Sequence, residues 1–304
     1  MLKDFDELVR KATENPGRMS VVAIAGAGDK SVIDSGLKAR EAGIAEPLFV
    51  GDAAVIRRIL SDEGAEVPDA MIVDAGEENP AQVAVDQVRE GKADVLMKGL
   101  VDSKSFLGPL VKRENGLRGE GMMSHVALFE IPGYHKLFMT SDGGMILYPD
   151  LDTKVQIVNN AVKALHALGW KEPKLAAVCH VEEENPKIQV TVDGAELQRM
   201  NERGEITGCR IVGPISYDCA MSREIAEHKG FDCPYSGDFD GFILPDIVAG
   251  NILGKCLTVT AGAKMAGVVM GAKVPVILAS RGSDADEKFN SIAMAALITR
   301  ELGK

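Results

Sequence analysis

The chain has 304 residues, of which 46% are hydrophobic and 26% are charged, and its formal net charge is −11. An acidic chain with one tryptophan, four tyrosines and no basic tract is poorly suited to bind nucleic acid or an anionic membrane surface. Length and composition are those of an ordinary globular protein with one large or two medium domains.

The sequence also bears on the compartment. No apolar run reaches the length of a transmembrane helix, and residues 1–11 have the pattern of an amphipathic helix rather than of a signal peptide. The five cysteines form no CxxC pair and no cluster with histidine. We therefore expect a cytoplasmic protein with reduced thiols and no structural zinc.

Apolar runs of strand length alternate with helical patterns in the first third of the chain. Strands are expected at 20–25, 48–50, 71–74 and 93–97, and helices at 1–11, 32–42, 53–60, 81–89 and 103–111. Such alternation predicts right-handed βαβ crossovers and a mostly parallel sheet. The short, uniformly apolar strands indicate that helices cover both faces of that sheet.

A second lobe is expected after the polar, glycine-rich segment 113–121 (RENGLRGEG). Asp152 or Thr153 should cap a long amphipathic helix that Gly169 ends. Strands are expected at 126–131, 136–139, 175–180, 210–212, 241–244, 268–270 and 274–279, and helices at 157–168, 194–202, 221–228, 247–257 and from 289 onward. We interpret residues 137–268 as a lobe inserted into a first lobe made of 1–136 plus 269–304, to whose sheet the last strand returns.

The turn after the last strand carries the most conspicuous polar group. The apolar run 276–279 ends at Ser280-Arg281-Gly282, and three carboxylates follow at Asp284, Asp286 and Glu287. In open α/β sheets, ligands bind beyond the carboxyl ends of strands. The alternative is structural, because acidic residues in the first turn of a helix also favour the helix dipole.

Polar residues follow other predicted strands in the same way. A lysine at a strand end can offer a point charge to an anion, and glycines let main-chain N–H groups approach a ligand. Each of these groups alone could be a solvated turn or a helix cap. Together we interpret them as the walls of one cleft. They are Lys98, Ser141, Asp142, Gly213, Pro214, Asp218, Asp246, Asn251 and Lys255.

Several familiar motifs are incomplete or missing. Gly26-Ala27-Gly28 would need a third glycine where Ser31 stands, and neither GxxxxGK[ST] nor GxSxG occurs. His125 and His180 could act as acid–base groups, but their apolar neighbours are more typical of packed histidines. The aspartates at 218, 238, 240 and 246 are scattered over loops, so no metal site is expected.

The ordered set of turns resembles the phosphate acetyltransferase and phosphate butyryltransferase family over about residues 21–297. The length of the chain and the long segment 100–132 are more similar to the butyryltransferase branch. The residues that carry the resemblance are Gly28-Asp29-Lys30, Ala42-Gly43-Ile44, Val50-Gly51-Asp52, Ala93-Asp94, Lys98-Gly99, Ser141-Asp142, Gly213-Pro214, Tyr217-Asp218, Phe242-Ile243-Leu244-Pro245-Asp246, Gly250-Asn251, Lys255, Pro275-Val276 and Ser280-Arg281-Gly282.

The resemblance implies a two-lobed α/β fold with parallel sheets, similar to isocitrate and isopropylmalate dehydrogenases, with the active site in the interlobe cleft. It also implies transfer of a short acyl group, butyryl in this branch, between coenzyme A and inorganic phosphate. Members of the family use no metal or bound cofactor, since coenzyme A is a substrate, and form dimers or larger homo-oligomers. The CoA thiolate would attack directly in a ternary complex.

Roles for single residues also follow from the resemblance. Arg281 would hold phosphate oxygens in its planar fork, and Ser280 would donate to the developing charge on the acyl oxygen. An acidic residue would accept the thiol proton: ungapped spacing points to Glu287, and a one-residue gap points to Asp286, which we prefer here. Arg118 is the candidate for a second anion contact.

Three alternatives stay open. A phosphate acetyltransferase would use the same chemistry on a smaller acyl group. A dehydrogenase on the related fold would need a nucleotide site. A non-catalytic module that senses acyl-CoA or acyl phosphate would bind without turnover.

Overall fold

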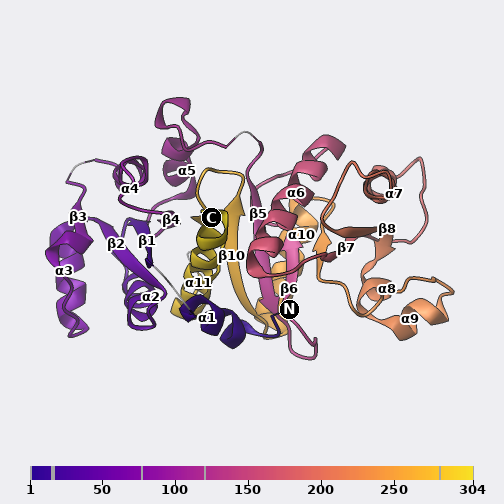
Figure 1. Cartoon of the computed structure of the whole chain (residues 1–304), viewed down its shortest axis with the longest axis horizontal. Coiled ribbons are helices and arrows are strands. Elements are labelled where there is room, and N and C mark those ends of the chain that lie inside the picture. Colours follow the sequence, from indigo (N-terminus) through magenta and orange to yellow (C-terminus); the bar gives the residue numbers. More distant parts are fainter. Residues whose placement is uncertain (1, 15–17, 77, 120, 281, 304) are drawn as a thin grey trace. The chain divides into compact units, whose positions relative to one another are not determined.

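The computed structural model describes residues 2–14, 18–76, 78–119, 121–280 and 282–303 (Figure 1). It divides into two compact units. The first unit comprises Phe5–Gly121 and Met265–Lys304, and the second unit comprises Met1–Asp4 and Met122–Lys264. In the described part of the chain, no helix is both long and apolar enough to cross a membrane.

The first unit contains a sheet in the order β3-β2-β1-β4-β11-β10. Neighbouring strands are parallel except for β10, which pairs antiparallel with β11. The strands are β1 (Ser20–Ala25), β2 (Ala45–Gly51), β3 (Ile72–Asp74), β4 (Val95–Lys98), β10 (Lys264–Met270) and β11 (Val276–Ile277). The predicted return of the last strand is confirmed, because Val276 pairs with Leu96 and Ile277 with Met97 of β4.

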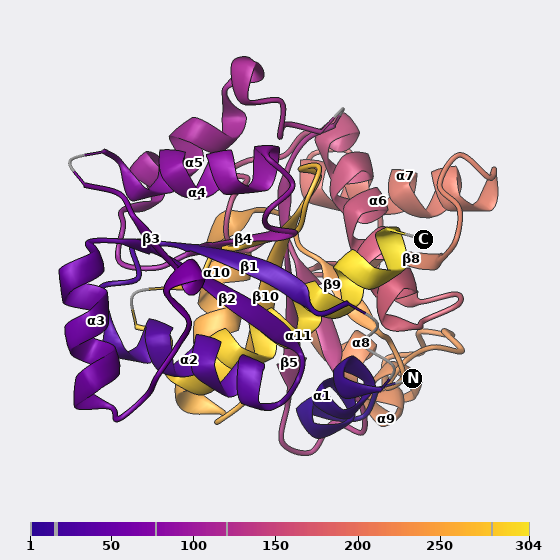
Figure 2. The ribbon, with the colours of Figure 1, turned by 60° about the vertical axis from the view of Figure 1, so that its left-hand side comes forward.

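Helices lie on both faces of this sheet (Figure 2). One face carries α4 and α5, and the other carries α2 and α11, with α1 packed on α11. Residues Ile292–Leu297 of α11 are at most 2% exposed, so this helix is a core element rather than an amphipathic surface helix. The helices are α1 (Phe5–Thr13), α2 (Lys30–Glu41), α3 (Ala53–Asp62), α4 (Pro80–Arg89), α5 (Ser103–Val111) and α11 (Ala285–Leu302), with 3₁₀ turns at Asp69–Met71 and Arg113–Asn115.

The second unit contains a sheet in the order β5-β6-β9-β7-β8. Its strands are parallel except for β5, which pairs antiparallel with β6. The strands are β5 (Ser124–Glu130), β6 (Phe138–Ser141), β7 (Lys174–Cys179), β8 (Arg210–Ser216) and β9 (Gly241–Ile243). The helices are α6 (Leu151–Leu168), α7 (Gln189–Glu202), α8 (Tyr217–Met221), α9 (Arg223–His228) and α10 (Ile247–Lys255), which a π-helical turn (Cys256–Thr260) extends.

The predicted fold class, α/β with mostly parallel strands, is therefore confirmed. The compact units differ from the predicted lobes at their boundaries. Ala127 of β5 pairs with Thr140 of β6, and the neighbouring residues pair in the same way. The second unit therefore starts at Met122 rather than at residue 137. It ends at Lys264 rather than at residue 268, because β10 pairs with β11 of the first unit.

Local sequence explains where many helices begin. An aspartate or asparagine side chain accepts a main-chain N–H of the first turn and so replaces a bond that the helix cannot make itself. The cap of α6 is Asp150, which accepts from Thr153 at 2.9 Å, and not Asp152 or Thr153 as expected. Gly169 ends that helix in the left-handed region, as predicted, at a φ of 106°. The capping residues of this kind are Asp29, Asp52, Asn79, Asp102, Asp150, Asp246 and Asp284.

Candidate functional site

In the first unit, the carboxyl ends of three neighbouring parallel strands lie at one edge of the sheet. Ala25 of β1 pairs with Lys98 of β4, and Ile277 of β11 pairs with Met97. The turns that follow these strands therefore lie at the same edge, and the predicted residues Lys98 and Ser280 belong to it. Lys98 is only 4% exposed, and its ammonium lies 3.3 Å from the carbonyl oxygen of Val101.

The turn between β11 and α11 is built by short-range hydrogen bonds. Ser280 is exposed, its carbonyl oxygen accepts from the N–H of Ser283 at 3.1 Å, and its hydroxyl oxygen accepts from the N–H of Gly282 at 3.3 Å. Asp284 caps α11 by accepting from the N–H of Glu287 at 2.8 Å. Arg281, the predicted phosphate ligand, lies outside the described residues.

The two candidates for the general base have different surroundings. The hydroxyl of Ser283 donates to the Glu287 carboxylate at 2.5 Å, so this half-buried side chain folds back over the turn that carries Ser280. Asp286 instead pairs with Lys38 of α2 at 2.6 Å, and its side chain is 74% exposed. The geometry therefore favours Glu287, the reverse of the preference that we drew from the sequence.

Arg118 is not brought to this turn. Arg118 is exposed and forms a β-bridge with Ala272, and the carbonyl oxygen of Leu117 accepts from the N–H of Lys273 at 2.9 Å. Ala272 and Lys273 precede β11, whereas Ser280 follows it. Arg118 and Ser280 thus belong to opposite ends of the same strand.

In the second unit, Ser141 and Asp142 follow β6, but both are buried and bonded to the main chain. The Asp142 carboxylate is 2% exposed and accepts from the N–H groups of His125, Gly144 and Met145 at 2.7–2.8 Å. The Ser141 hydroxyl donates to the carbonyl oxygen of His125 at 2.8 Å. These two residues hold the turn in place through main-chain bonds, and their contact with substrate stays a prediction.

The two histidines singled out from the sequence differ. The imidazole of His125 is buried against Gly144, where an added Cβ would lie 3.0 Å from the ring. Burial lowers the pKa of His125, and the nearby Asp142 carboxylate opposes this effect. His125 is therefore a packed histidine, whereas His180 is exposed after β7.

The start of α10 lies against the turn of Ser141. A Cβ on Gly250 would lie 2.6 Å from the Cα of Gly143, so only glycine permits this approach. The Asp246 side chain accepts from the N–H of Ala249 at 2.9 Å and so caps α10. Asn251 and Lys255 are exposed on α10, and the Asn251 amide donates to the carbonyl oxygen of Gly143 at 3.4 Å.

Gly213 and Pro214 do not form a strand-to-helix turn, as we had expected. Both are buried inside β8, which continues to Ser216. A Cβ on Gly213 would lie 2.6 Å from the Cβ of Ala177 on β7, and one on Gly194 of α7 would lie 3.2 Å from Pro214. These residues pack the sheet against α7, so the expected turn is corrected to a strand, whereas their contact with substrate stays a prediction.

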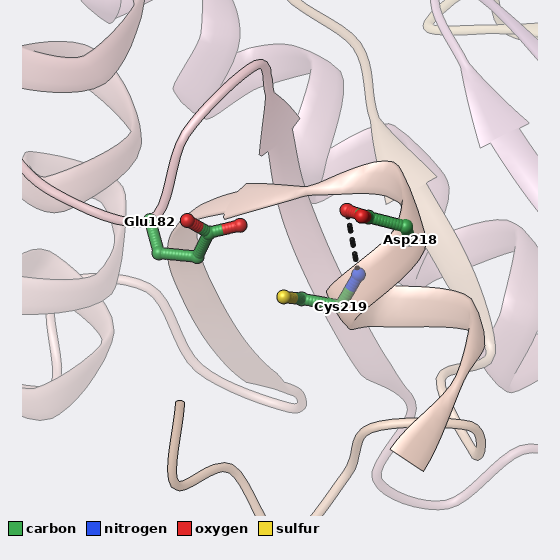
Figure 3. Close-up of side chains that lie close together, drawn as sticks. All are labelled: Glu182, Asp218 and Cys219. Atoms are coloured by element: carbon green, nitrogen blue, oxygen red, sulfur yellow. Dashed lines mark hydrogen bonds between the residues drawn. The ribbon is translucent and has the colours of Figure 1, made fainter. Parts of the chain in front are cut away.

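Asp218 belongs to a polar cluster that the sequence did not reveal (Figure 3). Ligand atoms of Glu182, Asp218 and Cys219 lie within 4.8 Å of one another. Asp218 accepts from the N–H of Cys219 at 3.0 Å, and the Lys229 ammonium lies 3.2 Å from Glu182 and 3.0 Å from Asp218. Parallel strands β7 and β8 bring these residues together from turns distant in sequence.

Lys229 partly neutralises the two carboxylates of this cluster. Hydrogen bonds from Ser216 and Lys229 lower the pKa of Asp218 to about 2, and the bond to Asp218 raises the pKa of Lys229 to about 12. Burial raises the pKa of the Cys219 thiol. Lys229 therefore supplies the cation between the two carboxylates, and the protonated thiol is a poor metal ligand.

The chain is similar to known proteins over most of its length. Residues 75–296 match the family model described as Phosphate acetyl/butaryl transferase. The chain is 41% identical to the phosphate butyryltransferase of Clostridium acetobutylicum, over 98% of this chain and 99% of that protein. It is 37% identical to the phosphate acetyltransferase of Thermotoga maritima, over 92% and 96%. The structure of a branched-chain phosphotransacylase from Enterococcus faecalis V583 superposes with a TM-score of 0.80 at 31% identity, covering 92% of this chain and 99% of that one.

Proposed function

Because this chain belongs to the phosphate acetyl/butyryl transferase family and moves acyl groups between coenzyme A and inorganic phosphate, we propose that butyryl-CoA is its preferred donor. The reaction is then butyryl-CoA plus phosphate giving butyryl phosphate plus CoA. The observation that supports this preference is the 41% identity to a phosphate butyryltransferase across nearly the whole of both chains. Family membership favours an acyltransferase over the dehydrogenase and the non-catalytic sensing module considered above.

The proposed mechanism starts, in the direction of acyl-CoA formation, from a ternary complex of CoA and butyryl phosphate. Glu287 accepts the thiol proton, and the resulting thiolate attacks the acyl carbon while the bond to phosphate breaks. The Ser280 hydroxyl donates to the charge that develops on the acyl oxygen. Arg281 holds the departing phosphate through paired N–H groups. In the reverse direction Glu287 returns the proton to the CoA sulfur.

Glu287 takes the role of base because of its orientation. Its carboxylate accepts from Ser283 and lies over the turn that carries Ser280, whereas Asp286 is engaged with Lys38. A base must lie within hydrogen-bond reach of the proton that it removes. Among the other predicted contacts, Lys98, Asn251 and Lys255 stay candidates for binding the anionic parts of CoA.

We further propose that the protein works in the cytoplasm as a homo-oligomer and needs neither a metal nor a bound cofactor. The mechanism above uses only proton transfer and hydrogen bonds, which side chains supply. The net charge of −11 and the single tryptophan support a protein that binds small anions at a local site rather than polyanions over a surface.

The first test mixes purified protein, butyryl-CoA and phosphate in the presence of EDTA and follows thiol release, with acetyl-CoA in parallel. We expect release that requires phosphate, with kcat/KM about tenfold or more higher for butyryl-CoA, since each methylene in an apolar pocket contributes ~1–3 kcal/mol. Faster turnover of acetyl-CoA would keep the reaction and refute the acyl preference. CoA binding without release would point to the sensing module instead.

A further inference from the structure

A buried lysine lies directly behind the turn that carries Ser280. Lys288, in the first turn of α11, is 4% exposed. Its ammonium donates to the main-chain oxygen of Ser283 and lies 3.4 Å from that of Asp284. Among the residues that the structure describes, Lys288 forms no ion pair with a carboxylate.

This environment is unfavourable for an ammonium in two respects. Burial of an unpaired charge is costly, and the positive end of a helix dipole repels a cation in the first turn. Two other buried lysines illustrate the usual solution. Lys136 lies 2.8 Å from Asp240, and Lys154 lies 2.6 Å from Asp193. At position 288 a methionine would fill similar space without a buried charge, so the charge at this position calls for another reason.

Ser283 indicates what that reason is. Its N–H donates to the carbonyl oxygen of Ser280 at 3.1 Å, and its hydroxyl donates to the Glu287 carboxylate at 2.5 Å. Its own carbonyl oxygen accepts from Lys288. Ser283 is 7% exposed and thus connects both candidate catalytic residues to one buried cation.

We propose that Lys288 is a positioning residue for acyl transfer. Its ammonium anchors the carbonyl groups of Ser283 and Asp284 to α11 and so fixes the orientation of Ser280 and Glu287 relative to each other. The expected effect on kcat rests on the proposed function, whereas the expected effect on the order of the turn rests on its geometry alone. A misplacement of catalytic groups by about 1 Å lowers the rate about 100-fold.

The kinetic test compares Lys288→Met with Lys288→Arg, which keeps the charge and the donors. We expect Lys288→Met to lower kcat about 100-fold while both KM values stay within about threefold, because Lys288 acts on orientation and not on binding. The kcat of Lys288→Arg should be at least about tenfold higher than that of Lys288→Met. Ile298→Val, a conservative truncation of a buried side chain in the same helix, controls for mild destabilisation and should keep wild-type kcat. A Lys288→Met enzyme with unchanged kcat, or with a raised KM and normal kcat, would overturn the proposal.

A second readout does not depend on activity. Hydrogen exchange in a peptide that covers residues 278–289 should become faster in Lys288→Met, while a peptide from α6 stays protected as in the wild type. If the wild type shows no acyl transfer, the proposed function fails, and this measurement still decides the structural role of Lys288. Unchanged exchange in 278–289, or an equal increase in Ile298→Val, would contradict it. Should Lys288→Met not fold, Lys288→Gln serves in both experiments.

Discussion

The turns after β6 and after β11 carry similar residues but differ in what their side chains do. In the turn of Ser141, the hydroxyl and both oxygens of Asp142 are bonded to main-chain groups, and both residues are buried. In the turn of Ser280, the serine side chain is exposed, and the carboxylate of Glu287 is only half-buried. The first turn is thus a scaffold whose polar groups satisfy one another, and the second offers groups to a ligand.

The comparison shows that a polar residue at a strand end is not by itself evidence of a binding site. Saturation of its hydrogen bonds distinguishes the two cases, because a carboxylate whose lone pairs accept three N–H groups has little capacity left for a substrate. On this basis, substitutions in the turn of Ser280 should change turnover, and those in the turn of Ser141 should change stability. The following experiments test that division.

Glu287→Gln should give the largest effect. The amide cannot accept the thiol proton, so we expect kcat to fall about 10²–10⁴-fold at neutral pH with little change in thermal stability. Glu301→Gln, an exposed substitution in the last turn of the same helix, is the control and should keep wild-type turnover. Retention of activity in Glu287→Gln would remove Glu287 from the mechanism.

Ser280→Ala should follow closely. Loss of one donor to a developing oxyanion lowers kcat about 10²–10³-fold, and KM for butyryl-CoA should change little because the bond forms only in the transition state. Steady-state kinetics in both directions measure this. A change in KM without a change in kcat would show that Ser280 binds the substrate in the ground state. The turn of Ser280 would then differ from the turn of Ser141 only in binding substrate.

Asp142→Ala tests the scaffold. Removal of the carboxylate leaves the N–H groups of His125, Gly144 and Met145 without their acceptor. The N–H group of His125 is buried, and an unsatisfied buried donor costs about 1–3 kcal/mol. We expect the free energy of unfolding in urea to fall by about 3 kcal/mol, with kcat of the folded variant lowered less than about tenfold. The opposite pattern, normal stability with turnover lost, would place Asp142 at the substrate.

Much of the fold was predictable from the sequence because it depends on local patterns. Short apolar runs predicted the strands, and apolar residues at helical spacing predicted most helices. The return of the last strand to the first sheet was predicted from the order of elements, and the structure identifies β4 as its partner. Boundaries were less accurate where tertiary pairing decides, as at β5, which begins at Ser124 and pairs with β6.

The candidate site and other polar clusters were harder to predict because they depend on contacts between residues distant in sequence. The sequence places Asp238 and Asp240 in a loop, yet both converge on the buried Lys136 at 3.0 and 2.8 Å, which no short-range pattern indicates. Glu182 reaches Asp218 only because β7 and β8 are parallel neighbours. Likewise, Gly213-Pro214 has the composition of a turn, but it lies inside β8. The close packing of β8 on β7 explains why residue 213 is a glycine.

Asp286→Asn should give the smallest effect and addresses the residue for which sequence spacing was ambiguous. Its ion pair with Lys38 is exposed, and such pairs contribute about 0–1 kcal/mol, so we expect stability to change by no more than this and kcat by less than about twofold. Added salt should reduce the difference in stability further, because it screens exposed charges. Helix geometry explains the expectation: neighbouring residues project about 100° apart, so Asp286 faces α2 when Glu287 faces the turn. If Asp286→Asn instead lost as much turnover as Glu287→Gln, the base would be Asp286 and α11 would have to present a different face to the substrate.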